Sequence, residues 1–232
     1  MITVTTRANS TALTTLDNVR SSLMISDRSD DAWLKRQVDA VSQMAIQVLG
    51  IEMAEDGTRN LGVETLSETL DRRTRYPWLP PLGVIRPRRE ADTIIVLGRR
   101  PVISIASITE NGTEVDPSDY ELFATDGRVK RLSSGLPSAW PCTLIVVNYT
   151  AGWKLPGDGA GVTGPALPSP IEEAVIEGIQ AKRAARTRDM GIKSENIPGI
   201  REVQYVVAAP GYDLPLPPSA MAKLDPYRNM SL

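Results

Sequence analysis

A basic and aromatic segment lies between residues 72 and 89. Its arginines interleave with one tyrosine and one tryptophan, as in proteins that hold single-stranded nucleic acid by phosphate pairing and base stacking. Runs of charge are more often solvated, so the segment indicates either contact with DNA or a loop in solvent or between subunits. Four prolines within it exclude a regular helix or strand. The candidate residues are Arg72, Arg73, Arg75, Tyr76, Trp78, Arg86, Arg88 and Arg89.

A second pattern, Gly159 to Gly164, matches the glycine spacing of dinucleotide-binding loops. In such a loop the glycines open a helix directly, so that the helix N-terminus meets the pyrophosphate. Here Pro165, Pro168 and Pro170 intervene before the helix. The pattern therefore predicts a connecting loop, and we expect no nucleotide cofactor.

The composition removes most catalytic chemistry. The chain has no histidine, which excludes the usual general base at neutral pH, the Ser-His-Asp and Cys-His sites, and the commonest transition-metal ligand. One cysteine, Cys142, cannot build an intrachain disulfide or a cysteine-based zinc site. Carboxylates or lysine alone would have to gather in a cleft. We predict no catalytic residue, no cofactor and no metal.

Length and charge bound the class of protein. With 232 residues, 41% hydrophobic and 23% charged, the chain can bury a core as one large or two small domains. Its net charge of -2 argues against a protein that coats nucleic acid nonspecifically. No apolar run is long enough to span a membrane, and Met1 to Arg7 lacks the apolar stretch of a secretory signal. We expect a soluble protein made in a reducing cytoplasm.

Three segments have the apolar spacing of amphipathic helices: Leu16 to Leu23, Asp30 to Leu49 and Pro170 to Arg188. The first residue of the second segment is its expected N-cap. Ser169 and Glu172 have the spacing of a capping box at the start of the third. Each segment has one apolar face, so we predict that the three pack together.

Between the second and third helices the pattern changes to short β-type runs with turn signals. Asn111-Gly112 and Asp126-Gly127 are typical of tight hairpins. We predict a small antiparallel sheet or sandwich with strands at Val63 to Leu70, Thr93 to Leu97, Val102 to Ile108, Thr113 to Val115, Tyr120 to Phe123, Val129 to Leu132 and Leu144 to Tyr149.

The fold class that follows is α+β: a small helical bundle with an inserted antiparallel β-domain and an extended C-terminal arm. We predict a mobile N-terminal arm at 1–12, a helical core from 13–60 and 165–190, the β-domain at 61–153, a Gly/Pro loop at 154–164 and the C-terminal arm at 191–232.

The C-terminal arm combines a strand at Val203 to Val207, an extended run at Leu214 to Pro218 and a short helix at Ser219 to Tyr227. So short a helix is not stable alone and must dock on something. It either grips a neighbouring protein or folds back to complete the core of its own subunit. The candidate interface residues are Leu214, Leu216, Met221, Leu224 and Tyr227.

In its order of parts the chain resembles the head-tail connector proteins of tailed phages, the adaptor or head-completion family also found in gene-transfer-agent particles. The resemblance covers nearly all the chain from about Leu13 and rests on order and spacing. The segments that carry it are Leu16 to Arg20, Asp30 to Leu34, Pro101 to Ile105, Asp119 to Leu122, Gly127 to Val129, and Val147 to Trp153 leading through prolines to a helix.

The resemblance implies a structural virion protein at the head-tail interface, assembled in the host cytoplasm, with no catalytic residues. Such proteins form a homo-oligomeric ring, usually a dodecamer, beneath the portal protein. The ring continues the DNA channel toward a tail or stopper protein, with no membrane involved and no sequence-specific contact to the DNA. The Arg72 to Arg89 segment would then face the channel or a neighbouring subunit, and the C-terminal arm would grip the portal.

Two alternatives remain open at the level of sequence. The first is a β-sandwich module that binds a ligand such as a glycan by stacking it on Tyr76, Trp78, Trp140 and Trp153. The second is a carboxylate-dependent hydrolase. A ring on a portal supports the connector, whereas a glycan-binding monomer supports the module.

Overall fold

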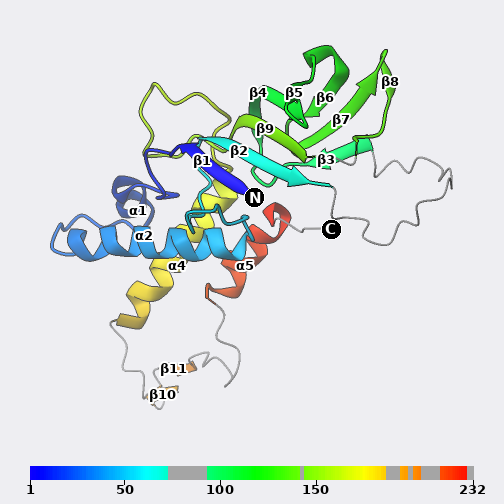
Figure 1. The fold of residues 1–232 in the computed structure, drawn as a ribbon. Helices are drawn as coiled ribbons and strands as arrows, with labels where there is room; N and C mark the ends of the chain where they lie inside the picture. Colours follow the sequence, from blue (N-terminus) through cyan, green and yellow to red (C-terminus); the bar gives the residue numbers. More distant parts are fainter. Residues whose placement is uncertain (73–92, 142–143, 187–193, 198–200, 205–214, 229–232) are drawn as a thin grey trace. The chain divides into compact units, whose positions relative to one another are not determined.

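The computed structural model describes residues 1–72, 93–141, 144–186, 194–197, 201–204 and 215–228, and of 194–197 and 201–204 the backbone only. The chain divides into two compact units. Unit 1 comprises Met1–Thr11 and Ile51–Ala166, and unit 2 comprises Ala12–Gly50 and Leu167–Leu232. Helices and antiparallel strands are both present, so the predicted α+β class is confirmed (Figure 1).

Unit 1 contains a five-stranded antiparallel sheet. Its order is β1 (Ile2–Thr6), β2 (Glu64–Asp71), β9 (Leu144–Ala151), β4 (Val102–Glu110) and β5 (Thr113–Glu114). Along β9 half-buried and buried residues alternate without a break, as expected of a strand with one face on a core. Strands β4 and β5 join through the predicted hairpin turn.

The second sheet of unit 1 is also antiparallel. Strand β7 (Arg128–Ser133) lies between β3 (Ile94–Val96) and β6 (Tyr120–Phe123), and β8 (Leu136–Pro137) pairs with its end. A 3-10 turn at Pro117–Asp119 leads into β6. Both sheets contribute to one hydrophobic core, which supports the predicted sandwich over a single layer. Its members include Leu66, Ile95, Leu97, Ile108, Val129, Ile145, Val147 and Tyr149.

The N-terminal residues differ from the predicted mobile arm, because Ile2–Thr6 forms β1 and pairs with β2. The side chain of Ile2 is only 1% exposed and belongs to the core of unit 1. Alternating Ile2 and Val4 with β-branched threonines favours a strand, so the signal was present in the sequence. The predicted helical core also extends too far, since residues from Ile51 onward belong to unit 1.

Unit 2 is built from helices. They are α1 (Leu16–Ser22), α2 (Asp31–Val48), α4 (Ser169–Arg186) and α5 (Pro218–Leu224), the last followed by a 3-10 turn at Asp225–Tyr227. A two-stranded pair, β10 (Ser194–Ile197) and β11 (Arg201–Gln204), lies between α4 and α5 in the chain. The strand predicted at Val203 to Val207 overlaps β11 by two residues, and its remainder lies outside the described residues.

The three predicted helices pack together, as Figure 1 shows for α2 and α4. A Cβ atom added to Gly178 of α4 would lie 2.8 Å from Cγ1 of Val41 and 2.9 Å from Cδ2 of Leu216. Glycine therefore lets these segments approach closely. The apolar faces of α2 and α4 are buried: Leu34, Val38, Val41, Ala45 and Ile46 on α2, and Ile171, Ala174, Val175 and Ile179 on α4.

The two predicted helix caps are used differently from what was expected. Asp30 precedes α2 but its side chain makes no capping hydrogen bond. Helix α4 begins at Ser169 itself, and the Glu172 carboxylate accepts hydrogen bonds from Thr14 Oγ1 (2.8 Å) and Asn18 Nδ2 (2.7 Å). The Glu172 carboxylate thus connects α4 to α1 and to Thr14 just before it, which are distant from α4 in the sequence.

Candidate functional site

The predicted DNA or intersubunit segment lies almost wholly outside the described residues. Arg72, at its start, directly follows β2, and its side chain is buried, with a relative exposure of 6%. An arginine in that position does not face a solvent-filled channel. The remaining candidates outside the described residues are Arg73, Arg75, Tyr76, Trp78, Arg86, Arg88 and Arg89.

The predicted C-terminal interface residues divide into two groups. Leu216 and Leu224 are buried in unit 2, at 3% and 0% exposure, because α5 packs on α4. This corresponds to the alternative in which the helix completes the core of its own subunit, so these two side chains are not free to grip a partner. Met221 and Tyr227 are half-buried. Leu214 lies outside the described residues.

An ion-pair cluster fastens α5 to α4. Nζ of Lys223 lies 2.6 Å from Oε1 of Glu177 and 3.1 Å from Oε2 of Glu173. Hydrogen bonding to the two carboxylates raises the pKa of Lys223, and the hydrogen bond from Lys223 lowers the pKa of Glu177. These groups are substantially exposed, so each pair adds little stability. Most of the free energy that holds α5 on α4 comes from burial of the apolar face of α5.

Of the aromatic residues proposed as stacking platforms, Trp140 is buried in the fold and Trp153 is half-buried. Trp140 is 2% exposed and its indole N–H donates to the carbonyl of Val129 at 3.2 Å. The Arg131 guanidinium lies 5.7 Å from the centroid of its ring, within cation–π range. Trp140 is therefore a core residue of unit 1.

A polar cluster is buried inside unit 1. The hydroxyl of Tyr149 donates to Oε2 of Glu68 at 2.7 Å, and the same carboxylate accepts from the backbone N–H of Gly98 at 3.0 Å. The side chain of Arg99 donates to the carbonyls of Asn60 and Thr58, each at 3.3 Å. Because these groups are buried, the cluster orders the interior of unit 1.

Burial also shifts the pKa values of the groups in this cluster. Burial raises the pKa of Glu68 even though the hydrogen bonds from Tyr149 and Gly98 act in the opposite direction. It raises the pKa of Glu64, against the attraction of Arg99, and it lowers the pKa of Arg99 itself. The pKa of Tyr149 is raised by burial and by Glu68. Burial in the sandwich thus disfavours the charged forms of Glu64, Glu68 and Arg99.

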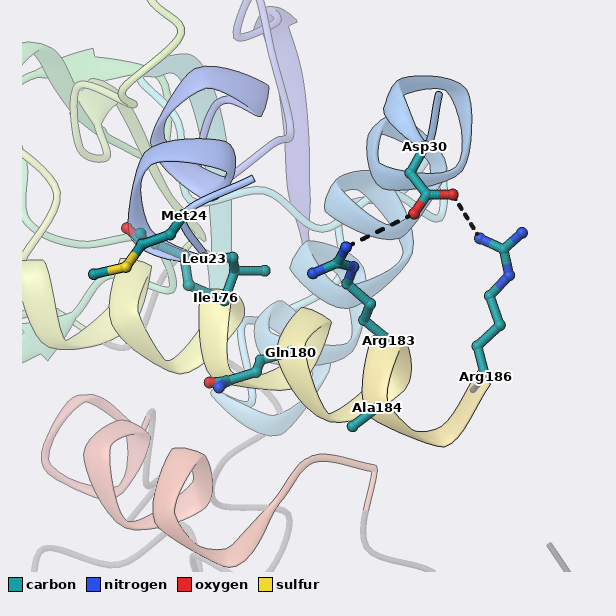
Figure 2. A pocket seen from close by; sticks show the side chains of 9 residues that line it. Leu23, Met24, Asp30, Ile176, Gln180, Arg183, Ala184 and Arg186 are labelled. Atoms are coloured by element: carbon teal, nitrogen blue, oxygen red, sulfur yellow. Dashed lines mark hydrogen bonds and ion pairs between the residues drawn. The ribbon is translucent and has the colours of Figure 1, made fainter. Parts of the chain in front are cut away.

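An open groove of about 810 Å³ lies on unit 2 between the end of α1 and the C-terminal half of α4 (Figure 2). Leu23 and Ile176 supply apolar surface to it, and Gln180, Arg183 and Arg186 project from α4. No motif in the sequence indicated this groove, because its walls are separated by about 150 residues of chain. Its lining residues are Ser22, Leu23, Met24, Asp30, Ile176, Gln180, Arg183, Ala184 and Arg186.

Two arginines share one carboxylate at the rim of the groove. Nη1 of Arg186 lies 3.0 Å from Oδ1 of Asp30, and Nη2 of Arg183 lies 4.0 Å from Oδ2 (Figure 2). The Arg186 guanidinium also lies 5.3 Å from the centroid of the Trp33 ring. With two cations and one anion, the rim carries a surplus of positive charge.

Met24 stands at the end of α1 in a left-handed conformation, with φ of 52°. Its N–H donates to the carbonyl of Ser21 at 3.2 Å, and the N–H of Ile25 donates to that of Arg20 at 2.9 Å. These two bonds define a Schellman ending, in which this position is usually glycine. The Met24 side chain is 94% exposed. An exposed methionine here is strained and gains nothing from the core.

The described part of the chain holds no cluster of three or more His, Cys, Asp or Glu residues suited to a metal ion. Among its helices, none combines the length and apolarity that crossing a membrane requires.

No protein-family model and no curated protein matches the sequence. A solved structure, the neck of an empty GTA (gene-transfer-agent) particle computed with C6 symmetry, contains a chain that matches 100% of this chain over 97% of its own length. The sequence identity is 16% and the TM-score is 0.53. The neck of a native GTA particle computed with C12 symmetry matches over the same shares at 15% identity and a TM-score of 0.48. The first of these matches shows that the chain has the fold of a protein from the neck of a gene-transfer-agent particle.

Proposed function

We propose that this chain is a structural protein of the virion neck, present in several copies at the interface between head and tail. The observation that carries the proposal is the fold match to a neck chain over essentially the full length of both proteins, at a TM-score of 0.53. Because the match covers the whole chain, it includes both compact units and the segments through which the chain passes from one unit to the other.

Within the neck, the proposed role is that of an adaptor. Copies of the chain form a ring of twelve beneath the portal protein and continue the DNA channel toward a tail or stopper protein. DNA passes through without sequence-specific contact, and the net charge of -2 suits passage better than tight coating. The ring is built in the host cytoplasm and is carried in the virion. The order of motifs from Leu13 onward supports this role.

A ring needs a heterologous contact, in which two different surfaces of each copy meet. Unit 1 and unit 2 each carry large apolar side chains in solvent, which is the material such a contact uses. They are Met1, Met53, Val96, Phe123 and Leu136 on unit 1, and Met24 on unit 2. For the portal contact we propose the half-buried Met221 and Tyr227, since Leu216 and Leu224 are committed to the core.

The decisive experiment measures the mass and shape of the purified chain, alone and mixed with its portal protein, by mass photometry and electron microscopy. A ring that docks on the portal supports the proposal. A chain that stays monomeric, does not bind the portal protein and binds glycans contradicts the proposal. Deletion of the gene should leave heads without attached tails, and supplying the chain in trans should restore attachment.

A further inference from the structure

The strained backbone of Met24 and its exposed side chain call for an explanation outside the subunit. A left-handed non-glycine residue that is held in an ordered helix ending is an outlier that points to function. Methionine suits an interface because its flexible thioether side chain adapts to the partner surface. Met24 also lines the groove on unit 2 next to Leu23 (Figure 2).

The groove specifies the chemistry of its occupant. Its apolar surface at Leu23, Met24 and Ile176 fits an apolar side chain, and the surplus positive charge of Arg183 and Arg186 favours acidic neighbours beside it. The expected occupant is therefore an exposed apolar residue that projects from an acidic loop.

Such a loop is present on unit 1. Met53 is 53% exposed and stands between the exposed Glu52 and Glu55. Asp56, the next acid, pairs with Arg7 at 2.7 Å, so the acidic character of the loop comes from Glu52 and Glu55. The other exposed apolar side chains of unit 1 have different surroundings. Met1 carries the N-terminal ammonium, whose positive charge the arginines of the groove would repel. Val96 and Phe123 both lie beside Arg128, their partner in the sheet register, and Leu136 follows the uncharged turn at 133–135. Charge complementarity selects the Met53 loop.

The Met53 loop is also held in place before any contact forms. Ile51 and Ala54 are buried on either side, at 7% and 4% exposure. The N–H of Glu55 donates to the carbonyl of Ile2 at 2.8 Å, and that of Ala54 donates to the carbonyl of Thr58 at 2.9 Å. The loop thus presents Met53 outward at little further entropic cost, as a preorganised contact does.

We propose that Met53 of one copy inserts into the α1–α4 groove of the next copy, against Met24, with Glu52 and Glu55 facing Arg183 and Arg186. The inference rests on the proposed ring and names the surfaces that build it. Groove and loop belong to different units of the chain, so the contact is heterologous and can close a ring.

Cysteine cross-linking tests the pairing in assembled rings. The single native cysteine is removed as Cys142→Ser, and Met24→Cys and Met53→Cys are introduced singly and together. After oxidation with copper phenanthroline, the double variant should give a ladder of covalent multimers on a denaturing gel. Each single variant should stay monomeric, and a mixture of the two singles should stop at dimers.

Other gel patterns overturn the proposal. Rings by microscopy with no ladder mean that another surface builds the ring and leave the proposed neck function standing. Dimers from a single variant mean a symmetric contact, and a compact monomer from the double variant means a contact within one copy. A chain that neither forms rings nor gives a ladder, alone or on the portal, overturns both proposals.

A second variant separates assembly from folding. Met24→Gly introduces a residue that tolerates the left-handed conformation, so its melting temperature should rise. The protein concentration at half-assembly should nevertheless rise by about tenfold or more, as for a buried interface anchor. Gln43→Ser, at an exposed position on α2 outside the groove lining, is the control and should assemble normally. Normal assembly of Met24→Gly would overturn the contact.

Discussion

The hydroxyl of Tyr149 on β9 donates a 2.7 Å hydrogen bond to Glu68 on β2, one diagonal step across the sheet. In the register Tyr149 lies opposite Leu66, and Glu68 lies opposite Val147. A slip of one residue would move either side chain to the other face of the sheet. The bond thus ties a buried polar pair to one particular register.

Glu68→Gln should stabilise the protein increasingly as the pH rises. Burial raises the pKa of Glu68 above the ordinary value of 4.5, so the folded protein binds this proton more tightly than the unfolded chain. The favourable contribution of the wild-type group is complete below pH 4.5 and is lost as the pH rises toward the folded pKa. The amide keeps an acceptor for Tyr149 and never ionises.

Urea unfolding of both proteins from about pH 4 to about pH 8 measures this difference. The advantage of the variant should grow with pH and then level off. Glu121→Gln, on the exposed side of β6, is the matched control. A constant difference across the range would show that burial of Glu68 does not perturb its ionisation.

Val38→Asp should destabilise the helical unit strongly. Val38 lies on the buried face of α2 at 5% exposure, so the substitution buries an unpaired charge and should cost about 3 kcal/mol or more. Ala40→Asp, on the exposed side of the same helix, should change the free energy of unfolding by about 0.5 kcal/mol or less. Equal melting temperatures for the two variants would rule out the packed helix layer.

Met24→Gly should raise the free energy of unfolding by about 1 kcal/mol, because glycine adopts the left-handed conformation without a Cβ penalty. Met24→Ala is the matched variant: it removes the same exposed side chain and retains the penalty, so it should give no gain. Chemical denaturation distinguishes them. A stability loss in the glycine variant would mean that the Met24 side chain contributes to the fold of the subunit.

Removal of α5 should destabilise unit 2. Leu224 is fully buried, and Leu224→Ala should cost about 2 to 5 kcal/mol. Truncation after Ala209 should cost more, because Leu216 and Ala220 are lost as well. Met221→Ala, at a half-buried position, should have a smaller effect. An unchanged melting temperature of the truncated protein would show that α5 does not stabilise unit 2 and is a free arm.

Replacing Arg86, Arg88 and Arg89 together with serine should weaken either DNA retention or ring assembly, because the segment is dense in arginine beside Tyr76 and Trp78. Loss of DNA that grows with ionic strength would indicate phosphate contacts. Loss of rings without loss of DNA affinity would indicate a subunit contact. Particles with normal rings and normal DNA content would exclude both roles.

The sequence predicted elements whose signals are local. Strand β6 has the predicted bounds, Tyr120 to Phe123, and the turn at Asn111-Gly112 has the two positive φ angles, 50° and 84°, that such a hairpin requires. Helix α2 lies within one residue of its predicted limits, since a long amphipathic period is hard to mistake.

The misinterpreted features depend on distant partners. Asp30 was expected to cap α2, but its carboxylate pairs with Arg186, 156 residues away, and Glu172 bonds to Thr14 rather than to its own helix end. Strand β1 finds its partner only at Glu64–Asp71. The α1–α4 groove has no sequence signature because its walls meet only after folding. The methionine at position 24, just past the end of a short helix where glycine is usual, was the one local sign of an unusual surface there.

The chain leaves unit 2 at Gly50 and returns to it at Leu167, which sets an order during translation. At about 5 to 20 residues per second, β1 waits about 3 to 12 seconds for β2, and α2 waits about 6 to 24 seconds for α4. All of unit 1 has been synthesised before the first residue of α4. On the ribosome, the sandwich can therefore finish folding while the apolar face of α2 is still exposed and in need of protection from aggregation.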